Sequence, residues 1–442
     1  MQSFQPDESG ARVQTFRWYH PLRDLYWNFA LSRNRIIRHK LSSIALPRPA
    51  ESVTASPSRR QFLAAASGFA IFPALLSGKL LRTNASDSAI PSLYKSLADY
   101  FPVGAAVRPD DLVPPHSDLL TSQFNSVVAE NAMKWRALRP SEDAFNFSAA
   151  DAIVNFANAH HMLIRGHNLV WHVNNPRWLF KDAAGDDLKP IAESKSLVLR
   201  RLETHIRTVV SRYRDDVYAW DVVNEVVDPK QPDGFRRSDW FRFTGTDYID
   251  TAFRVAREVA PRAKLFVNDY ETTNPAKRDF LLRLVQDLKS RGVPVDAMGH
   301  QTHINLESPT VDSIVESIEK FSALGLDNQI TELDVSVYTN PIDSCDAIPE
   351  AVLAEQGYRY RDLFNAFRSL KGKISGVTLW GYADDHTWLR RFPRNRLDDP
   401  LLFDERLLPK PAFWGIVDPS RLAPRSSISV PADFNSCSSG KQ

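Results

Sequence analysis

The chain has 442 residues, of which 43% are hydrophobic and 24% charged, so it can bury a large core and is neither an intrinsically disordered nor a fibrous protein. Its 55 Lys and Arg residues nearly balance 53 Asp and Glu residues, giving a formal net charge of +2. Because a surface that binds nucleic-acid phosphates needs concentrated positive charge, we expect no nucleic-acid partner and favour a neutral ligand.

The cysteine content limits the kinds of cross-link and metal site. Only Cys345 and Cys437 are present, which excludes a disulfide scaffold and a four-thiolate zinc site. One bridge is possible, and the sequence leaves open whether the two residues pair. The ten tryptophans indicate either flat ligands or an aromatic core.

The N-terminal part differs from the rest of the chain. Residues 1–57 show no sustained helical or strand period and are predicted to be a disordered leader. An arginine pair, Arg59 and Arg60, then precedes the apolar run 64–76, which is shorter than the roughly 20 residues that span a bilayer. This pattern resembles a twin-arginine signal, so residues 58–90 are interpreted as signal peptide and linker, with cleavage near Ala85.

The signal implies a periplasmic or extracellular protein with no stable membrane association after signal removal. Such a signal normally lies near the N-terminus, so the start is suspected to be misassigned, with Val53 as the alternative start. Two other interpretations stay open: the arginines could cap a buried helix, or the apolar run could be retained as a membrane anchor.

Residues 91–419 alternate short apolar segments with amphipathic stretches, a pattern typical of a parallel sheet with helices packed around it. Eight strands are predicted, at 103–106, 126–130, 163–170, 217–224, 264–269, 297–303, 329–335 and 376–382. Helical periodicity occurs at 194–213, 248–259, 277–291 and 311–324. The pattern predicts one α/β domain, a (β/α)8 TIM barrel. The Ser- and Pro-rich residues 420–442 are predicted to form a flexible tail, and we expect a monomer.

Polar residues are concentrated at the predicted strand ends, where the chemistry of such barrels is located. They are Glu130, Asn131, His167, Trp171, His172, Asn224, Glu225, Asn268, Asp269, Gln301, His303, Glu332, Asp334 and Trp380. Burying unpaired charge is costly, so a whole ring of such groups indicates a ligand site. No glycine-rich phosphate-binding pattern follows any strand, and we expect no cofactor.

Two of these residues, Glu225 and Glu332, fit glycoside cleavage, which needs one protonated acid and one ionised carboxylate. Asp334 shares a strand face with Glu332, and His303 lies on the adjacent strand, so this network could keep Glu332 ionised as a nucleophile. Glu225 has no basic residue within four positions, so a raised pKa would suit a general acid. The neighbouring Asn224 is expected to reach a sugar hydroxyl.

The sequence around these residues resembles glycoside hydrolase family 10, the retaining endo-β-1,4-xylanases, over residues 93–418. The matching segments are 124–135, 165–172, 220–225, 299–303, 330–335, 380–388 and 400–411. The resemblance implies that Glu225 is the acid/base and Glu332 the nucleophile. It also implies a set of sugar-binding residues: Glu130, Asn131, Lys134, His167, Trp171, Trp380 and Trp388. Gln301 would contact the nucleophile region. Asn174 stands where the family usually has Gln, which puts that contact in doubt.

Simpler interpretations of these residues stay open. Glu130 and Lys134 could form a surface ion pair, worth about 0.3 to 0.5 kcal/mol, and the tryptophans could be core residues. His167 and His172 could be core histidines or a zinc pair, although no cysteine is near and a spacing of five places them on opposite faces of a continuing strand. No metal is therefore expected.

The sequence predicts a secreted, retaining endo-xylanase that acts on xylan and xylo-oligosaccharides. Two rival functions remain: a cellulase or mixed β-glucanase, and a catalytically silent carbohydrate-binding protein. The binding protein is disfavoured because both Glu225 and Glu332 are present, and carbohydrate binding alone requires neither of them.

Overall fold

The structure is a computed structural model that describes residues 90–431 and 434. The leader predicted at 1–57 and nearly all of the signal segment predicted at 58–90 lie outside the described residues. Within residues 90–431, no helix is both long and apolar enough to cross a membrane.

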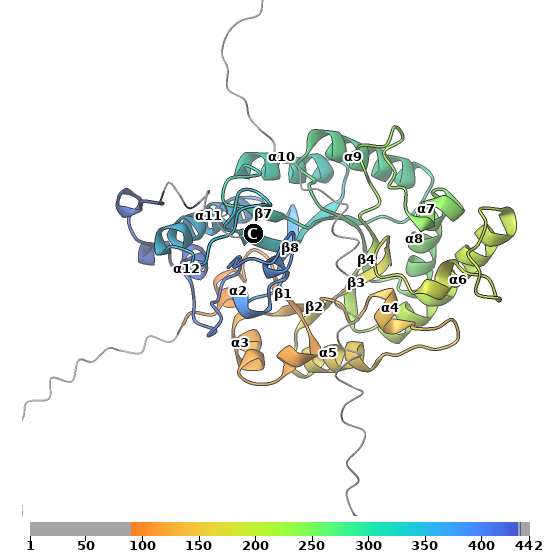
Figure 1. The fold of residues 1–442 in the computed structure, drawn as a ribbon, viewed down its shortest axis with the longest axis horizontal. Coiled ribbons are helices and arrows are strands. Elements are labelled where there is room, and N and C mark those ends of the chain that lie inside the picture. The colour runs from red at the N-terminus through yellow and green to blue at the C-terminus, as the bar shows by residue number, and fades with distance from the viewer. Residues whose placement is uncertain (1–89, 432–433, 435–442) are drawn as a thin grey trace, which may run out of the picture. The chain divides into compact units, whose positions relative to one another are not determined.

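Eight parallel strands form a closed barrel at the centre of the described residues (Figure 1). They are β1 (Val103–Val107), β2 (Ser126–Ala129), β3 (Leu163–Trp171), β4 (Val217–Asn224), β5 (Lys264–Asp269), β6 (Ala297–His300), β8 (Asp327–Ser336) and β9 (Ile374–Leu379). Strands that are consecutive in this series pair in parallel, and β9 also pairs with β1, which closes the ring. The predicted TIM barrel is confirmed, and each predicted strand overlaps an observed one.

The sixth predicted strand, 297–303, is interrupted. Thr302 has a φ of 61°, a left-handed conformation that does not continue a β-ladder. The strand ends at His300, and a separate strand β7 (His303–Asn305) pairs with the outer half of β8, with His303 opposite Asp334. The interruption therefore brings His303 beside the carboxylates of β8.

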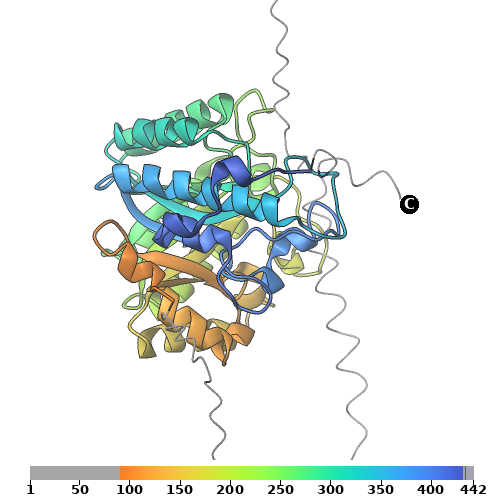
Figure 2. The same cartoon turned by 90° about the vertical axis from the view of Figure 1, so that its left-hand side faces the viewer.

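Helices surround the barrel (Figures 1 and 2). They are α2 (Leu93–Ser96), α3 (His116–Gln123), α4 (Trp135–Leu138), α5 (Ser148–Ala159), α6 (Ala192–Arg212), α7 (Asp239–Thr244), α8 (Asp247–Val259), α9 (Pro275–Ser290), α10 (Val311–Ser322), α11 (Glu350–Ser369) and α12 (Pro411–Val417). The four predicted helices correspond to α6, α8, α9 and α10. In α8 the buried residues Ile249, Ala252, Phe253 and Ala256 form one stripe at helical spacing, which packs towards the barrel.

Two helix starts show why the boundaries fall where they do. The side chain of Asn274 accepts hydrogen bonds from the backbone of Ala276 and Lys277, and Pro275 follows it at the first position of α9. The Thr310 side chain accepts from the Ser313 amide at the start of α10. Each cap satisfies amide groups that the helix itself leaves unpaired.

The C-terminal segment contacts the barrel domain at the described positions. Leu422 is buried, and the Phe434 ring stacks on Tyr338 with centroids 5.4 Å apart. Cys345, which packs in the same apolar cluster, is disulfide-bonded. Cys437 is the only other cysteine of the sequence and lies outside the described residues. Flexibility of the tail 420–442 remains a prediction.

Gly166 on β3 is expected to tolerate no side chain. A Cβ atom at this position would lie 2.1 Å from the indole ring of the fully buried Trp220. Gly166→Ala should therefore lower the free energy of unfolding by about 1–3 kcal/mol, the usual cost of overpacking a core. Urea denaturation of wild type and variant measures the difference. An unchanged midpoint and slope would show that Trp220 moves aside freely.

Candidate active site

Glu225 follows β4 at the mouth of the barrel and is buried, with a φ of 58°. Its amide donates to the Asn268 carbonyl on β5 at 2.9 Å, and Arg236 donates to its carbonyl oxygen at 2.6 Å. The carboxylate oxygen Oε1 accepts from Gln301 at 3.1 Å and from Asn224 at 3.4 Å. Backbone and side chain are both held by neighbours, so the carboxyl group is fixed in one position.

Glu332 lies on β8 and is also buried. Its Oε1 accepts from Asn268 at 2.8 Å, and its Oε2 lies 3.0 Å from His303 Nε2. The other ring nitrogen of His303 lies 2.9 Å from Asp334 Oδ2, which also accepts from the Trp388 indole at 2.8 Å. His303 therefore connects Glu332 to Asp334, the contact expected from the strand register.

Asn268 connects the two glutamates. Its side-chain amide donates both to Glu332 and to Asn224, at 2.8 Å each, and Asn224 in turn donates to Glu225. The side-chain oxygen Oδ1 of Asn268 accepts from the Thr331 hydroxyl at 2.7 Å, which fixes the orientation of the side-chain amide. Residues from β4, β5 and β8 thus form one hydrogen-bonded group containing both carboxylates.

The surroundings of Glu332 favour its ionised form. Burial alone would raise the pKa of Glu332, but the hydrogen bond from His303 and the nearby His167 and His303 rings outweigh it and hold that pKa below its usual value. Burial alone would lower the pKa of His303, whereas Asp334 and then Glu332 raise it to about 9. His303 is accordingly protonated at neutral pH, and each of its ring nitrogens donates to a carboxylate.

His303→Gln should shift the pH dependence of the reaction. The substitution removes a positively charged donor from Glu332, so the pKa of Glu332 should rise and a larger fraction should be protonated in mildly acidic solution. The acidic limb of kcat/KM should therefore move to higher pH, by about one unit if the change in interaction is near 1.4 kcal/mol. Profiles of kcat/KM for wild type and variant measure the shift.

His160→Gln provides a control for this measurement, because His160 is an exposed histidine at the end of α5. The control should leave both limbs unchanged. An acidic limb at the wild-type position in His303→Gln would contradict the role given to His303.

The predicted sugar-binding residues at β2 lie together. Glu130 and Lys134 are buried, and Lys134 donates to Asn131 at 3.1 Å while Asn131 donates to Glu130 at 3.1 Å. The ammonium group lies 4.9 Å from the centroid of the Trp171 ring and 5.8 Å from that of Trp380. The surface ion pair considered above is wrong, since both residues are buried and Asn131 lies between them.

The aromatic residues of the site combine packing with polar contacts. Trp380 is buried and packs against Ala106 and Val128, and the partly buried Trp388 packs against this cluster. The alternative that the tryptophans are core residues therefore holds in part. The Trp380 ring also makes an edge contact with His167 at 5.1 Å. Trp388 is less buried and binds Asp334 through its indole N–H.

His167 and His172 contact different glutamates. His167 Nδ1 lies 3.9 Å from Glu332 Oε1 and 2.9 Å from Asp221, which is buried with Arg165 as its ion-pair partner. His172 Nδ1 lies 3.9 Å from Glu225 Oε2. Among the described residues, one group of side chains, Asp111, His116 and His386, has potential metal-ligand atoms close together, and neither His167 nor His172 belongs to it. Asn174 has a φ of 63° and is buried, and its effect on substrate contact stays a prediction.

Sequence reasoning missed three residues of the site, namely Asp221, Arg165 and Arg236, and did not predict the bridging role of Asn268. Asn268 is one of the polar strand ends, but no local pattern shows that it bridges two glutamates. Asp221 and Arg165 are charged residues inside apolar strands, a signal that indicates paired burial. Arg236 lies in an irregular segment without periodicity.

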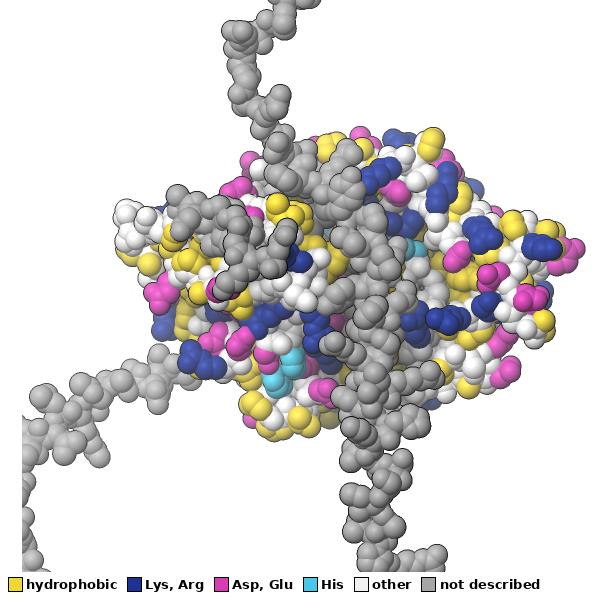
Figure 3. All heavy atoms as spheres, viewed as in Figure 1, with side chains coloured by type: hydrophobic (Ala, Val, Ile, Leu, Met, Phe, Trp, Pro, Cys, Tyr) yellow, Lys and Arg dark blue, Asp and Glu magenta, His cyan; other side chains and the backbone are white. Residues whose placement is uncertain are grey.

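The molecular face in Figure 3 carries basic and acidic side chains interspersed around the barrel. The near-equal numbers of Lys plus Arg and Asp plus Glu in the sequence are thus reflected in a mixed surface on this face.

The family model for glycosyl hydrolase family 10 matches residues 92–419. The chain belongs to this family. A "Thermostable celloxylanase" of Thermoclostridium stercorarium is 47% identical over 350 residues, covering 77% of this chain and 90% of that protein. "Endo-1,4-beta-xylanase A" of Halalkalibacterium halodurans is 46% identical over 345 residues, covering 74% of this chain and 87% of that protein.

Solved structures of family members have the same fold. Xylanase B from Clostridium stercorarium F9 is 48% identical, with a TM-score of 0.73 over 75% of this chain and 100% of that one. A family 10 structure from Paenibacillus barcinonensis is 41% identical, with a TM-score of 0.72 over 76% of this chain and 99% of that one. The barrel of this glycoside hydrolase is therefore a known family fold.

Proposed function

We propose that this glycoside hydrolase cleaves internal β-1,4-xylosidic bonds of xylan with retention of configuration, with Glu332 as nucleophile and Glu225 as general acid/base. The observation that carries the assignment is the hydrogen bonding of Glu332. Glu332 accepts from the protonated His303 and from Asn268, whereas Glu225 accepts from the neutral amides of Gln301 and Asn224. The environment of Glu332 favours the ionised carboxylate that a nucleophile requires.

In the first step Glu332 attacks the anomeric carbon while Glu225 protonates the departing glycosidic oxygen. A covalent glycosyl–enzyme intermediate results. Glu225, now ionised, then takes a proton from water, which displaces Glu332 and releases the sugar with its original configuration. Retaining enzymes place the two carboxyl groups about 5–5.5 Å apart.

The choice of xylan rests on the relatives together with the site. Several relatives at 42–47% identity carry names of xylanases. A cellulase remains the second candidate because another relative, 43% identical, is named "Exoglucanase XynX". Glu130 and Lys134 are buried at the proposed sugar site, and we propose that they exclude the hydroxymethyl group that glucose has and xylose lacks.

Release of reducing ends from xylan and from carboxymethylcellulose distinguishes these substrates. We expect a marked preference for xylan. A preference for carboxymethylcellulose would contradict the substrate assignment without affecting the two catalytic glutamates.

The stereochemistry of the product tests the mechanism directly. Proton NMR of the first product from a xylo-oligosaccharide should show the β-anomer before mutarotation, because two displacements at one carbon restore the configuration. An α-anomer as the first product would contradict a nucleophilic role for Glu332.

Export and oligomeric state are proposed from the sequence alone. The arginine pair Arg59 and Arg60 and the apolar run 64–76 support export by the twin-arginine route to the periplasm or medium. We also propose that the protein is a monomer. N-terminal sequencing of the mature protein and light scattering test the two proposals. A mature chain that retains residues 1–80 would contradict the first, and a dimer the second.

A further inference from the structure

Arg108 joins two parts of the barrel mouth that carry predicted sugar-binding residues. It directly follows β1, and its Nε atom forms an ion pair with Glu130, which directly follows β2. Its Nη2 atom donates to the carbonyl oxygen of His386 at 2.5 Å, in the 3₁₀ turn Asp384–His386 that precedes Trp388. One guanidinium group therefore contacts both Glu130 and the loop after β9.

We propose that Arg108 is a positioning residue for sugar binding. It fixes the Glu130 carboxylate so that this group accepts hydrogen bonds from the xylose unit next to the attacked one, on the glycone side. The inference rests on the proposed function, in which Glu130 binds sugar, and Arg108 acts through Glu130. Arginine suits this role because its guanidinium group stays protonated and its N–H groups project in fixed directions.

Glu130 lies apart from the nucleophile, with several side chains between them. The hydrogen-bonded group of Glu130 includes Lys134, whose ammonium group lies 5.8 Å from the centroid of the Trp380 ring. The Trp380 ring contacts His167, and His167 Nδ1 lies 3.9 Å from Glu332 Oε1. Glu130 therefore fits the neighbouring sugar and not the attacked sugar itself.

The Glu130 carboxylate has acceptor positions left for sugar hydroxyls. A carboxylate has about four such positions. Arg108 donates to Oε2, and Asn131 donates to Oε1 at 3.1 Å. Donors on both oxygens define the orientation of the carboxylate. The Glu130 side chain is 11% exposed, so part of it stays accessible to a ligand.

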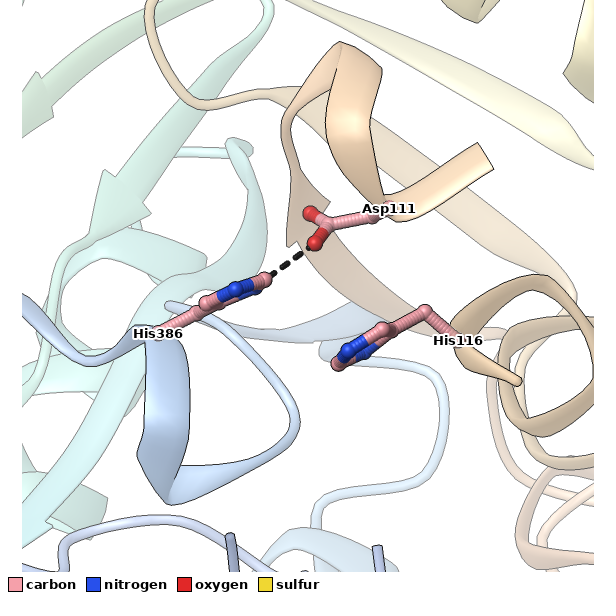
Figure 4. A group of neighbouring side chains, drawn as sticks. All are labelled: Asp111, His116 and His386. Carbon is pink, nitrogen blue, oxygen red and sulfur yellow. Dashed lines mark hydrogen bonds and ion pairs between the residues drawn. The ribbon is translucent and has the colours of Figure 1, made fainter. Parts of the chain in front are cut away.

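Arg108 is itself held in place by a cluster on the loops after β1 and β9. Its amide donates to Asp111 Oδ2 at 2.7 Å, and the Asp111 amide donates back to the Arg108 carbonyl at 3.0 Å. Asp111 Oδ1 lies 2.7 Å from His386 Nδ1 (Figure 4). The His386 ring stacks on that of His116, with centroids 4.9 Å apart. The backbone of Arg108 and the residue that its side chain binds are thus fixed by the same cluster.

Kinetics on substrates with one and two sugars test the proposal. A dinitrophenyl β-xylobioside places a sugar at Glu130, whereas a dinitrophenyl β-xyloside fills only the site of attack. Arg108→Met should lower kcat/KM on the xylobioside by about 10–100-fold, mainly through KM, because the second sugar loses hydrogen bonds to a charged group in ground and transition state alike. The value on the xyloside should stay within experimental error of wild type.

Two further variants sharpen this measurement. Arg108→Lys should recover part of the loss, since it keeps the charge but lacks the fork of N–H groups that contacts Glu130 and the loop together. Arg207→Met is the matched control, because Arg207 on α6 forms an exposed ion pair with Glu258 on α8. The control should leave kcat/KM on both substrates unchanged.

A double-mutant cycle shows whether Arg108 acts through Glu130. Glu130→Ala should also lower kcat/KM selectively on the xylobioside, and adding Arg108→Met to it should cause no further loss. If thermal unfolding shows that Arg108→Met does not fold, Arg108→Lys takes its place in the cycle. Additive losses, or equal losses on both substrates, would overturn the proposal.

Failure of the proposed function gives a different result. A wild type that hydrolyses neither substrate nor xylan would contradict the proposed function and this inference with it. A wild type that prefers the xylobioside, together with the same preference in Arg108→Met, would overturn only the role of Arg108.

Discussion

Glu332→Ala should reduce kcat on xylan by about 10⁴-fold or more, since the double displacement cannot begin without the nucleophile. The loss should be as large on aryl xylobiosides with good leaving groups, because bond formation to Glu332 is required whatever group departs. Steady-state kinetics on both substrates measure the effect. The hydrogen bonds of Asn268 and His303 to Glu332 would be lost together with the carboxylate.

Glu319→Ala offers a matched control on the surface. Glu319 lies on α10 and pairs with Lys373 at an exposed position, so its removal should leave kcat within experimental error. Residual activity of Glu332→Ala within tenfold of wild type would show that another group attacks the anomeric carbon.

Glu225→Ala should produce a selective loss. The kcat on xylan should fall by about 10²–10⁴-fold, because the departing sugar oxygen is a poor leaving group without protonation. Formation of the glycosyl–enzyme from a dinitrophenyl xylobioside should be nearly unaffected, since dinitrophenolate departs without a proton. Hydrolysis of the intermediate should then be slow, so a stopped-flow burst of dinitrophenolate should precede a slow steady state.

The pH profile provides the second check on Glu225. In wild type the basic limb of kcat/KM reports loss of the acid proton, and this limb should disappear in Glu225→Ala on the activated substrate. An equal loss on both substrates would contradict the acid/base assignment and would favour a structural role for Glu225.

Much of the fold could be read from local pattern. The alternation of apolar segments and amphipathic stretches gave eight strands, each overlapping an observed strand, because burial on both faces demands apolar residues locally. The break at Thr302 was not predicted, since nothing in its neighbours indicates a φ of 61°. Helices α5 and α11 lie outside the four predicted helical ranges, although the buried residues Ala150, Ile153, Val154 and Ala157 of α5 have helical spacing.

The sequence by itself determined that Glu225 directly follows one strand and that Glu332 lies in the second half of another. Parallel strands share one direction in a closed barrel, so both residues are placed towards the same rim. Only the tertiary structure decided that Asn268 joins them and that His116 meets His386 across the first and last loops. Contacts between side chains far apart in the chain depend on the exact stagger of strands and the path of loops. A pattern of residue types along one segment does not encode either.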